Sequence, residues 1–354
     1  MAKMMKAAVW TAEGTLKVTD VPRPEIKAPN EVLARVRASG ICGSDLHGWK
    51  VPNPQRVGRI SGHELAGEVV EVGKAVTNIK PGDRVAIESL VGCGHCRWCN
   101  IGLYNLCPDL GKIRSETLAR GFSQYVAGPS EKFLKLAPKV KTEWAPLLDC
   151  YAVDVHAFQL ANIKMYETIA IIGLGPMGMA HADIGNAMGL KVIGLALRDE
   201  PLKVAKKIGT WETVNSSKED PVKKVLELTD GYGVDSAYLQ VGGRNLNPMI
   251  QALQMTKKNG KVMIVGLPTE QRSVNTFDPS LLRQERILRF VSSFSNWDEY
   301  SEAAICLDYM TRGKLHPADI ITHRFPLEEI NEAFETAAGK KESNAIKVEI
   351  IQED

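Results

Sequence analysis

The stretch that decides the fold is Ile171-Ile172-Gly173-Leu174-Gly175-Pro176-Met177-Gly178. It has the pattern G-x-G-x-x-G, it follows the apolar run 168–172, and a helical pattern begins inside it. In such a turn the first glycine permits a tight bend, the second lets a pyrophosphate approach the backbone, and the third lets helix and strand pack closely. A phosphate there would accept hydrogen bonds from N–H groups at the start of the helix. We therefore predict a dinucleotide site at Gly173, Gly175, Pro176, Met177 and Gly178; the alternative is a plain turn between a strand and a helix.

After this turn, strands and helices alternate along the chain. The predicted strands cover 191–197, 236–241 and 260–265, and the predicted helices cover 177–189, 200–208, 221–228 and 247–256. Such alternation predicts the α/β class, with a doubly wound parallel sheet. We assign residues 151–290 to this dinucleotide-binding domain.

Residues 1–150 have a different pattern. Alternating runs such as 32–38 and 67–73 end at turn residues, and little of this part reads as helix. We predict a β-rich domain here. The tail 291–354 is assigned to the same domain, because a doubly wound unit is complete without it.

Composition and charge exclude several classes of protein. Apolar residues make up 44% of the 354 residues and charged residues 24%, which argues against a disordered, collagen-like or coiled-coil chain. The 44 basic and 42 acidic side chains leave a net charge of +2, so nothing favours nucleic acid or an anionic membrane as partner. No stretch reads as a targeting or membrane-spanning segment, so we expect the cytoplasm.

The second strand of the α/β pattern bears on the choice of cofactor. NAD binding usually places an acidic residue at the end of this strand, where it binds the ribose 2′-hydroxyl. Here that position holds Ala196, and Arg198 follows, which could pair with a 2′-phosphate. The sequence therefore favours NADP over NAD. NAD stays open if Asp199 takes the ribose and Arg198 is only a solvated charge.

Four of the seven cysteines are close together in sequence. They are Cys93, Cys96, Cys99 and Cys107. Four thiolates complete a tetrahedron around zinc and leave no open position, so we predict a structural zinc site. Iron–sulfur ligation is the main alternative.

A second set of metal-binding residue types is scattered along the chain. Cys42 is followed by Ser44, Asp45 and His47, and further candidates are His63, Glu64, Asp149 and Cys150. Three protein ligands plus an open position are typical of catalytic zinc. From spacing alone, each of these residues could equally be an ordinary buried or surface group.

Several motifs occur in the order found in one known family. They are the segments 40–45, 62–67 and 81–85, the four-cysteine group and the glycine turn. With them the whole chain resembles the zinc-dependent medium-chain alcohol and polyol dehydrogenases, with details closest to the sorbitol, threonine and butanediol dehydrogenase branch. The resemblance implies a Rossmann domain beside a GroES-like catalytic domain with a structural zinc lobe. It implies hydride transfer between a secondary alcohol, polyol or sugar and NAD(P), with two zinc ions per subunit.

The resemblance also implies roles for single residues. Cys42 and His63 would hold the catalytic zinc, with Glu64 as an alternative ligand or as a neighbour of the ligands. Asp149 occupies the position of the branch's usual glutamate, and Cys150 is a rival ligand. An aspartate there, like the Ala196–Arg198 pattern, is similar to NADP-dependent secondary alcohol dehydrogenases.

A proton relay is implied as well. It would run from Ser44 through the cofactor ribose to His47 and solvent, while Asp45 orients His63. The family likeness further suggests a homo-oligomer, either a dimer or a tetramer.

Three other functions are weighed against this one. A zinc-free quinone-type reductase of the same fold would not need Cys42, His63 and Asp149. A nicotinamide-binding sensor or scaffold without turnover would have no use for an open zinc site. A zinc-ribbon nucleic-acid binder would need basic residues near the four cysteines, and no basic run occurs there.

Overall fold

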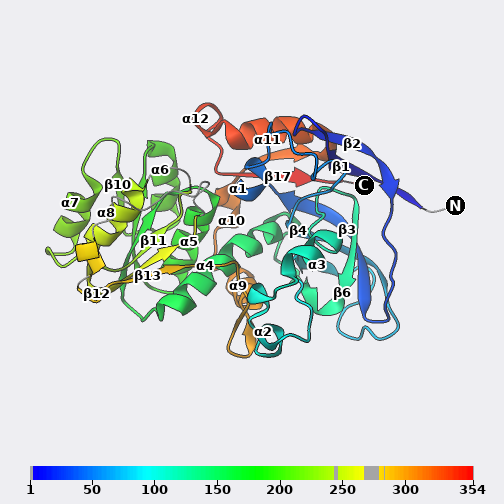
Figure 1. Cartoon of the computed structure of the whole chain (residues 1–354), viewed down its shortest axis with the longest axis horizontal. Helices are drawn as coiled ribbons and strands as arrows, with labels where there is room; N and C mark the ends of the chain where they lie inside the picture. The colour runs from blue at the N-terminus through cyan, green and yellow to red at the C-terminus, as the bar shows by residue number, and fades with distance from the viewer. Residues whose placement is uncertain (1–2, 243–245, 267–278, 283, 354) are drawn as a thin grey trace. The chain divides into compact units, whose positions relative to one another are not determined.

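The structure is a computed structural model that describes residues 3–242, 246–266, 279–282 and 284–353 (Figure 1). Contacts divide the chain into two compact units. Unit 1 comprises Met1–Asp149, Asp298–Arg312 and Ile321–Asp354, and unit 2 comprises Cys150–Trp297 and Gly313–Ile320. In the described part of the chain, no helix has both the length and the hydrophobicity needed to span a lipid bilayer.

Unit 2 is built on a six-stranded sheet in which all neighbouring strands are parallel. Its strand order is β10 (Glu212–Asn215), β9 (Lys191–Ala196), β8 (Thr168–Ile172), β11 (Val234–Leu239), β12 (Thr256–Ile264) and β13 (Ile287–Phe290). Parallel neighbours require crossover connections, and helices supply them. They are α5 (Pro176–Ala187), α6 (Asp199–Lys207), α7 (Pro221–Leu228) and α8 (Asn247–Met255), with α4 (Leu148–Ala161) and α10 (Pro317–Ile320) beside them. This architecture confirms the predicted doubly wound α/β fold.

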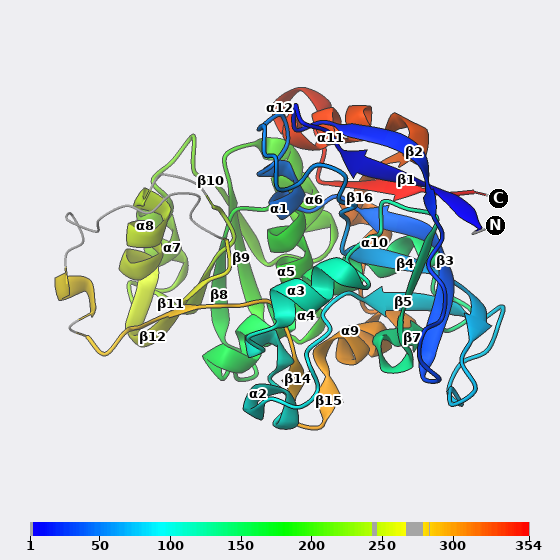
Figure 2. The ribbon, with the colours of Figure 1, turned by 45° about the vertical axis from the view of Figure 1, so that its right-hand side comes forward.

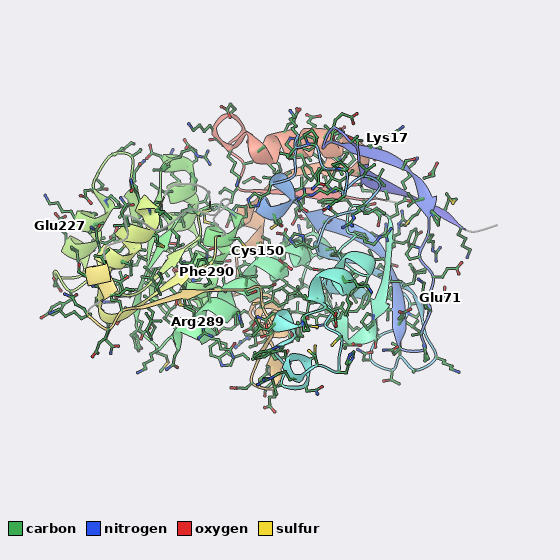
Figure 3. The ribbon with its side chains drawn as sticks, in the orientation of Figure 1. Lys17, Glu71, Cys150, Glu227, Arg289 and Phe290 are labelled. Atoms are coloured by element: carbon green, nitrogen blue, oxygen red, sulfur yellow. The ribbon has the colours of Figure 1, made fainter. Side chains whose placement is uncertain are left out.

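The segments 169–172, 192–195, 236–239 and 262–264 of strands β8, β9, β11 and β12 are buried, as expected of a sheet covered on both faces. The edge strand β13 differs, because Ile287 and Phe290 are 50% and 57% exposed. Figure 3 labels Phe290 and its neighbour Arg289 on this strand.

Unit 1 contains a seven-stranded sheet. Six of its strands follow the order β16 (Ile321–Pro326), β17 (Lys347–Ile351), β3 (Glu31–Gly40), β4 (Glu64–Val72), β5 (Arg84–Glu88) and β7 (Phe133–Lys135), and β6 (Tyr125–Pro129) also pairs with β3 (Figure 2). A hairpin of β1 (Met4–Trp10) and β2 (Leu16–Pro22) is separate from this sheet. The short strand β15 (Tyr300–Ser301) also belongs to unit 1, whereas β14 (Asn296–Trp297) belongs to unit 2. The helices are α1 (Gly43–Leu46), α2 (Arg97–Asn100), α3 (Leu110–Glu116), α9 (Glu302–Thr311), α11 (Ile330–Ala338) and α12 (Lys340–Ser343). Because β17 pairs with β3, the end of the chain completes the sheet that its beginning starts.

The division into units differs in detail from the predicted boundaries at 150 and 290. Residues 291–297 and 313–320 group with unit 2 rather than with the β-rich unit. Long-range hydrogen bonds explain this: Gln159 donates to the carbonyl of Asn296 (3.5 Å), and the His316 backbone N–H donates to the Asp183 carboxylate (2.7 Å). Such contacts leave no local signature in the sequence.

Candidate active site

Sheet register brings Cys42, His63 and Glu64 together in unit 1. Gly40, at the end of β3, pairs with Glu64, at the start of β4. Cys42 follows one strand and His63 precedes the other, so both lie at the same end of the pair. One ligand atom from each of the three residues lies within 4.8 Å of the other two. A thiol, an imidazole and a carboxylate at this separation match the donor set that zinc takes in proteins.

The Glu64 carboxylate is fully buried and accepts a hydrogen bond from Lys347, which is also fully buried. Lys347 donates to the carbonyl of Ile41 as well (3.3 Å). Gly40 leaves room for this pair, since a Cβ there would collide with the Glu64 carboxylate and lie 2.9 Å from Lys347 Nζ. A buried carboxylate without a partner would be costly, so Lys347 is part of what holds Glu64 in place.

Lys347 does not appear among the predicted site residues. The available signal is the pattern of the last strand, where Lys347 and Glu349 alternate with apolar residues in a strand that is buried on both faces. Glu349 is fully buried, and this burial raises its pKa to about 8. Charged residues in a buried strand indicate a charge network inside the fold.

Asp45 lies beside the ligand cluster. Its carboxylate accepts a hydrogen bond from the backbone N–H of Cys42 (3.0 Å), and its Oδ1 is 4.0 Å from His63 Nδ1. That separation is longer than a hydrogen bond. Burial raises the pKa of Asp45. The placement fits the predicted partnership with His63 and fixes the Cys42 backbone in addition.

Ser44 and His47 are both exposed. Ser44 lies on α1 and His47 caps its end, so they are three residues apart and lie on the same side of one helical turn. The side of α1 that reaches solvent therefore carries a hydroxyl and an imidazole close to Cys42.

Asp149 lies in the first turn of α4. Among the described residues, its carboxylate is not one of the ligand atoms gathered within 4.8 Å around Cys42. Its place in the zinc shell therefore stays a prediction. The rival Cys150 is 1% exposed, and Figure 3 shows it on α4.

The four cysteines of the lobe converge. One ligand atom from each of Cys93, Cys96, Cys99 and Cys107 lies within 4.8 Å of the other three. Backbone curvature makes this possible, because Gly94 and Gly102 adopt positive φ (77° and 80°) and a Cβ on Gly92 would lie 2.6 Å from Cys99 Sγ. The cradle fits a tetrahedral thiolate site with no open position.

The backbone of the lobe also donates hydrogen bonds to its sulfurs, with the thiolate favoured at Cys93, whereas burial raises the pKa of Cys99 to about 12. The N–H groups of Cys93, Cys96 and Cys99 donate to the sulfurs of Cys107, Cys93 and Cys96 at 3.3–3.4 Å. Backbone N–H donation, that of His95 first, lowers the pKa of the Cys93 thiol to about 6. Thiolates are the form that binds metal.

In unit 2 the glycine turn has the geometry of a phosphate cradle. Gly173 has φ 98°, and a Cβ on Gly178 would collide with the Gly173 carbonyl. Gly175 is the N-cap of α5, so the capping residue has no side chain that could accept from the N–H groups of the first turn, and Pro176 is the first residue of the helix. Met177 follows in that turn. The fit to a pyrophosphate rests on the N–H groups of this turn and on the close approach that glycine permits.

The residues after β9 bear on the choice between NADP and NAD. Arg198 is half-buried and caps α6. Asp199 accepts hydrogen bonds from Asn215 (2.6 Å) and Lys218 (2.7 Å), and Lys218 is the main cause that lowers its pKa. Asp199 is thus already engaged, which weakens the case for NAD recognition by this carboxylate.

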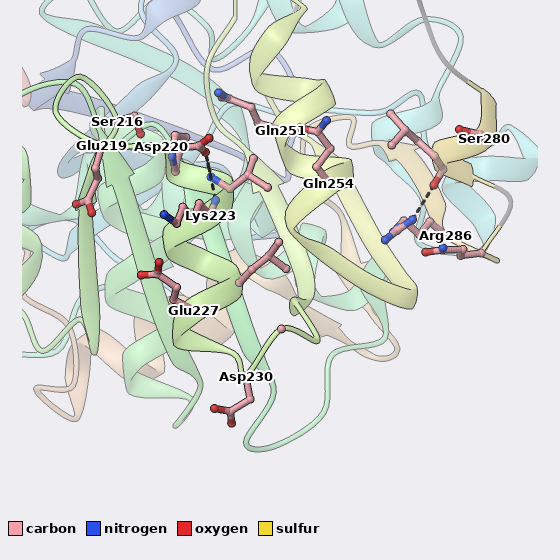
Figure 4. Close-up of a pocket in the computed structure, with 16 residues that line it drawn as sticks. Ser216, Glu219, Asp220, Lys223, Glu227, Asp230, Gln251, Gln254, Ser280 and Arg286 are labelled. Carbon is pink, nitrogen blue, oxygen red and sulfur yellow. Dashed lines mark hydrogen bonds between the residues drawn. The ribbon is translucent and has the colours of Figure 1, made fainter.

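A groove of about 1230 Å³ lies in unit 2, lined by α7, by α8 and by Ser280, Leu281, Gln284 and Arg286 (Figure 4). Its labelled side chains include Lys223 and Arg286 among several carboxylates and amides. Asp220 caps α7 there, and Arg286 donates to backbone carbonyls. The lining holds neither thiol nor imidazole, and we assign it no chemistry.

Known proteins support this interpretation. Residues 28–138 match the family described as alcohol dehydrogenase GroES-like domain, and residues 176–307 match the family described as zinc-binding dehydrogenase. A sorbitol dehydrogenase of Bacillus subtilis (strain 168) is 32% identical over 94% of this chain and 93% of its own length. A D-arabitol-phosphate dehydrogenase of Enterococcus avium is 34% identical over 99% of this chain and 98% of its own.

A solved structure agrees with these relatives. A zinc-binding dehydrogenase of Sinorhizobium meliloti 1021, bound to NADP, superposes with a TM-score of 0.83 at 26% identity, covering 99% of both chains. The chain therefore belongs to the zinc-dependent medium-chain alcohol and polyol dehydrogenase family, a family of oxidoreductases, as its motifs predict.

Proposed function

We propose that this protein oxidises a secondary alcohol group of a polyol or sugar, with NADP preferred over NAD and with two zinc ions per subunit. The observation that carries the proposal is the meeting of Cys42, His63 and Glu64 within 4.8 Å, beside the exposed Ser44 and His47. By their names, the relatives act on sorbitol and on a phosphorylated arabitol, which supports a polyol as substrate. The NADP-bound relative and the engaged Asp199 support the cofactor preference.

In this proposal Cys42 and His63 hold the catalytic zinc, with Glu64 or Asp149 completing its shell. When bound, zinc would supply a Lewis acid for the substrate oxygen, and the nicotinamide would supply the hydride acceptor. Ser44 takes up the proton of the substrate hydroxyl while giving up its own, and His47 passes a proton to solvent. Asp45 fixes the Cys42 backbone and faces His63, so that both ligands keep their orientation.

The other residues have supporting roles. The four cysteines hold the structural zinc. The glycine turn binds the pyrophosphate, and Arg198 binds the 2′-phosphate.

The test is to offer the protein a panel of polyols, sugars and simple secondary alcohols, once with NAD and once with NADP. Oxidation is measured by the absorbance of the reduced cofactor. We expect oxidation of at least one polyol, a higher kcat/KM for NADP, and two zinc ions per chain by elemental analysis. Cofactor binding without oxidation of any alcohol would favour the sensor or scaffold instead.

We also propose a homo-oligomer, a dimer or a tetramer, located in the cytoplasm. The exposed apolar side chains on the edge strand β13 support pairing with a second copy, since an open sheet edge offers unpaired backbone groups. Light scattering in solution tests the oligomeric state.

A further inference from the structure

Arg56 lies directly against the loop that carries the proposed proton relay. Its guanidinium covers the Cα of Gly48, the residue after His47, so closely that a Cβ on Gly48 would collide with Nη1 and lie 3.2 Å from Nη2. Gly48 is tied to α1, because its N–H donates to the carbonyl of Asp45 (3.2 Å). Because Gly48 has no side chain, the Arg56 guanidinium can pack directly against its backbone.

Among the described residues, no carboxylate forms an ion pair with Arg56, whose guanidinium packs near an aromatic ring instead. The side chain is half-buried, and its Cζ lies 5.5 Å from the centre of the Trp10 ring. The neighbouring Lys50 is paired with Glu335 (3.0 Å), so it does not need a further anion.

A second arginine, Arg120, belongs to a segment that pairs with the turn before His63. Arg120 is half-buried, and burial lowers its pKa. The next residue, Gly121, donates its N–H to the carbonyl of Gly62 (2.8 Å), which places the backbone of this segment alongside the metal-ligand turn.

We propose that the substrate carries an anionic group, a phosphate or a carboxylate, and that Arg56 binds it. This inference rests on the proposed function and narrows its substrate class. A planar guanidinium binds either anion through two parallel hydrogen bonds, and such charge-assisted bonds are strong in a partly desolvated site. Because the Arg56 guanidinium packs on Gly48, it lies next to His47. The anionic end of the substrate therefore lies on the solvent side of the relay.

The experiment compares sorbitol, sorbitol 6-phosphate and gluconate as ligands. The kcat/KM ratio of each anionic compound to sorbitol is measured for the native protein and for Arg56→Gln, Gly48→Ala and Arg59→Gln. Gly48→Ala keeps the charge of Arg56 but displaces its head group, and Arg59 is an exposed arginine that serves as the matched control. Binding of the same compounds is measured by calorimetry without cofactor.

We expect Arg56→Gln and Gly48→Ala to lower the ratio for one of the anionic compounds about 10- to 100-fold and to weaken its binding by a similar factor. The compound affected distinguishes phosphate from carboxylate. Arg59→Gln should leave the ratio within about threefold of the native value.

Equal ratios in Arg56→Gln and Arg59→Gln, with polyol oxidation intact, would overturn the inference and leave the proposed function standing. Binding of an anionic polyol that depends on Arg56, with no oxidation of any alcohol, would support the inference and contradict the proposed function.

Discussion

The four-cysteine lobe and the Cys42–His63–Glu64 cluster are both groups of candidate zinc ligands, but they are assembled in opposite ways. The lobe takes its ligands from one continuous segment, and backbone N–H groups of the same segment donate to its sulfurs. The cluster depends on the pairing of β3 with β4, and its Glu64 is held by Lys347, 283 residues away in sequence.

This difference in assembly goes with a difference in chemistry. In the proposed function, four thiolates fill the tetrahedron around zinc, so the lobe would serve stability. The cluster offers three ligand atoms and has an exposed hydroxyl and imidazole beside it, so in the same proposal it would serve turnover. If the contrast is right, damage to each group should produce a different kind of loss.

The largest effect is expected from Cys42→Ala. Removal of a ligand from the cluster should lower kcat/KM by roughly a thousandfold or more, because the substrate oxygen loses its Lewis acid. One of the two zinc ions should be lost, while the melting temperature stays close to the native value. Steady-state kinetics, elemental analysis and calorimetry measure these quantities, and full activity with one zinc missing would contradict the assignment.

Cys96→Ala should have the opposite profile. Opening the closed lobe should cost roughly 3 kcal/mol or more of stability, because the metal binds only the folded lobe. We expect a lower melting temperature and loss of one zinc ion, with kcat of the remaining folded enzyme largely preserved. The buried Cys306, which lies outside both groups, is the control through Cys306→Ala. A melting temperature as high as that of this control would show that the lobe is an ordinary loop.

Whether a group is assembled from one segment or from distant strands also determines how well the sequence alone predicts it. The lobe and the glycine turn depend on spacing within short segments, so spacing predicts them, and the strongly apolar strands of unit 2 are predicted for a similar reason. The ion pair of Glu64 with Lys347 packs against Gly40. This contact depends on the pairing of β17 with β3 and of β3 with β4, which no local sequence pattern encodes. The grouping of 313–320 with unit 2 likewise depends on hydrogen bonds to residues far away in sequence. The ligand role of Asp149 is implied by its family position and stays a prediction, since the ligand atoms gathered around Cys42 do not include its carboxylate.

Arg198→Ala tests a local site in unit 2. Loss of the guanidinium should raise the KM for NADP about 10- to 100-fold and change the KM for NAD by less than threefold, because only NADP carries the 2′-phosphate. The control is Asp199→Asn, at the carboxylate that Lys218 and Asn215 already engage. If Asp199→Asn raises the KM for NAD by a larger factor than Arg198→Ala raises the KM for NADP, the proposed preference for NADP is contradicted.

The smallest effect is expected at a long-range pair in unit 2. His316 Nδ1 lies 2.7 Å from Asp183 Oδ1, and Asp183 is fully buried and also accepts a hydrogen bond from Tyr151 (2.6 Å). The hydrogen bond with Asp183 raises the pKa of His316 above its ordinary value of 6.5. The protonated ring is thus favoured in the folded state, so its stabilising contribution is complete below pH 6.5 and is lost as the pH rises through the raised pKa.

Because the His316 side chain is 46% exposed, solvent screening should keep this contribution below about 1 kcal/mol. His316→Gln cannot become charged, so the difference in melting temperature between the native protein and this variant should shrink by about one degree from pH 6 to pH 8.5. Measuring the difference between the two proteins cancels the titration of every other group. A difference that is constant over this range would mean that the imidazolium does not stabilise the docking of 313–320, and that this long-range contact depends on the backbone N–H of His316 alone.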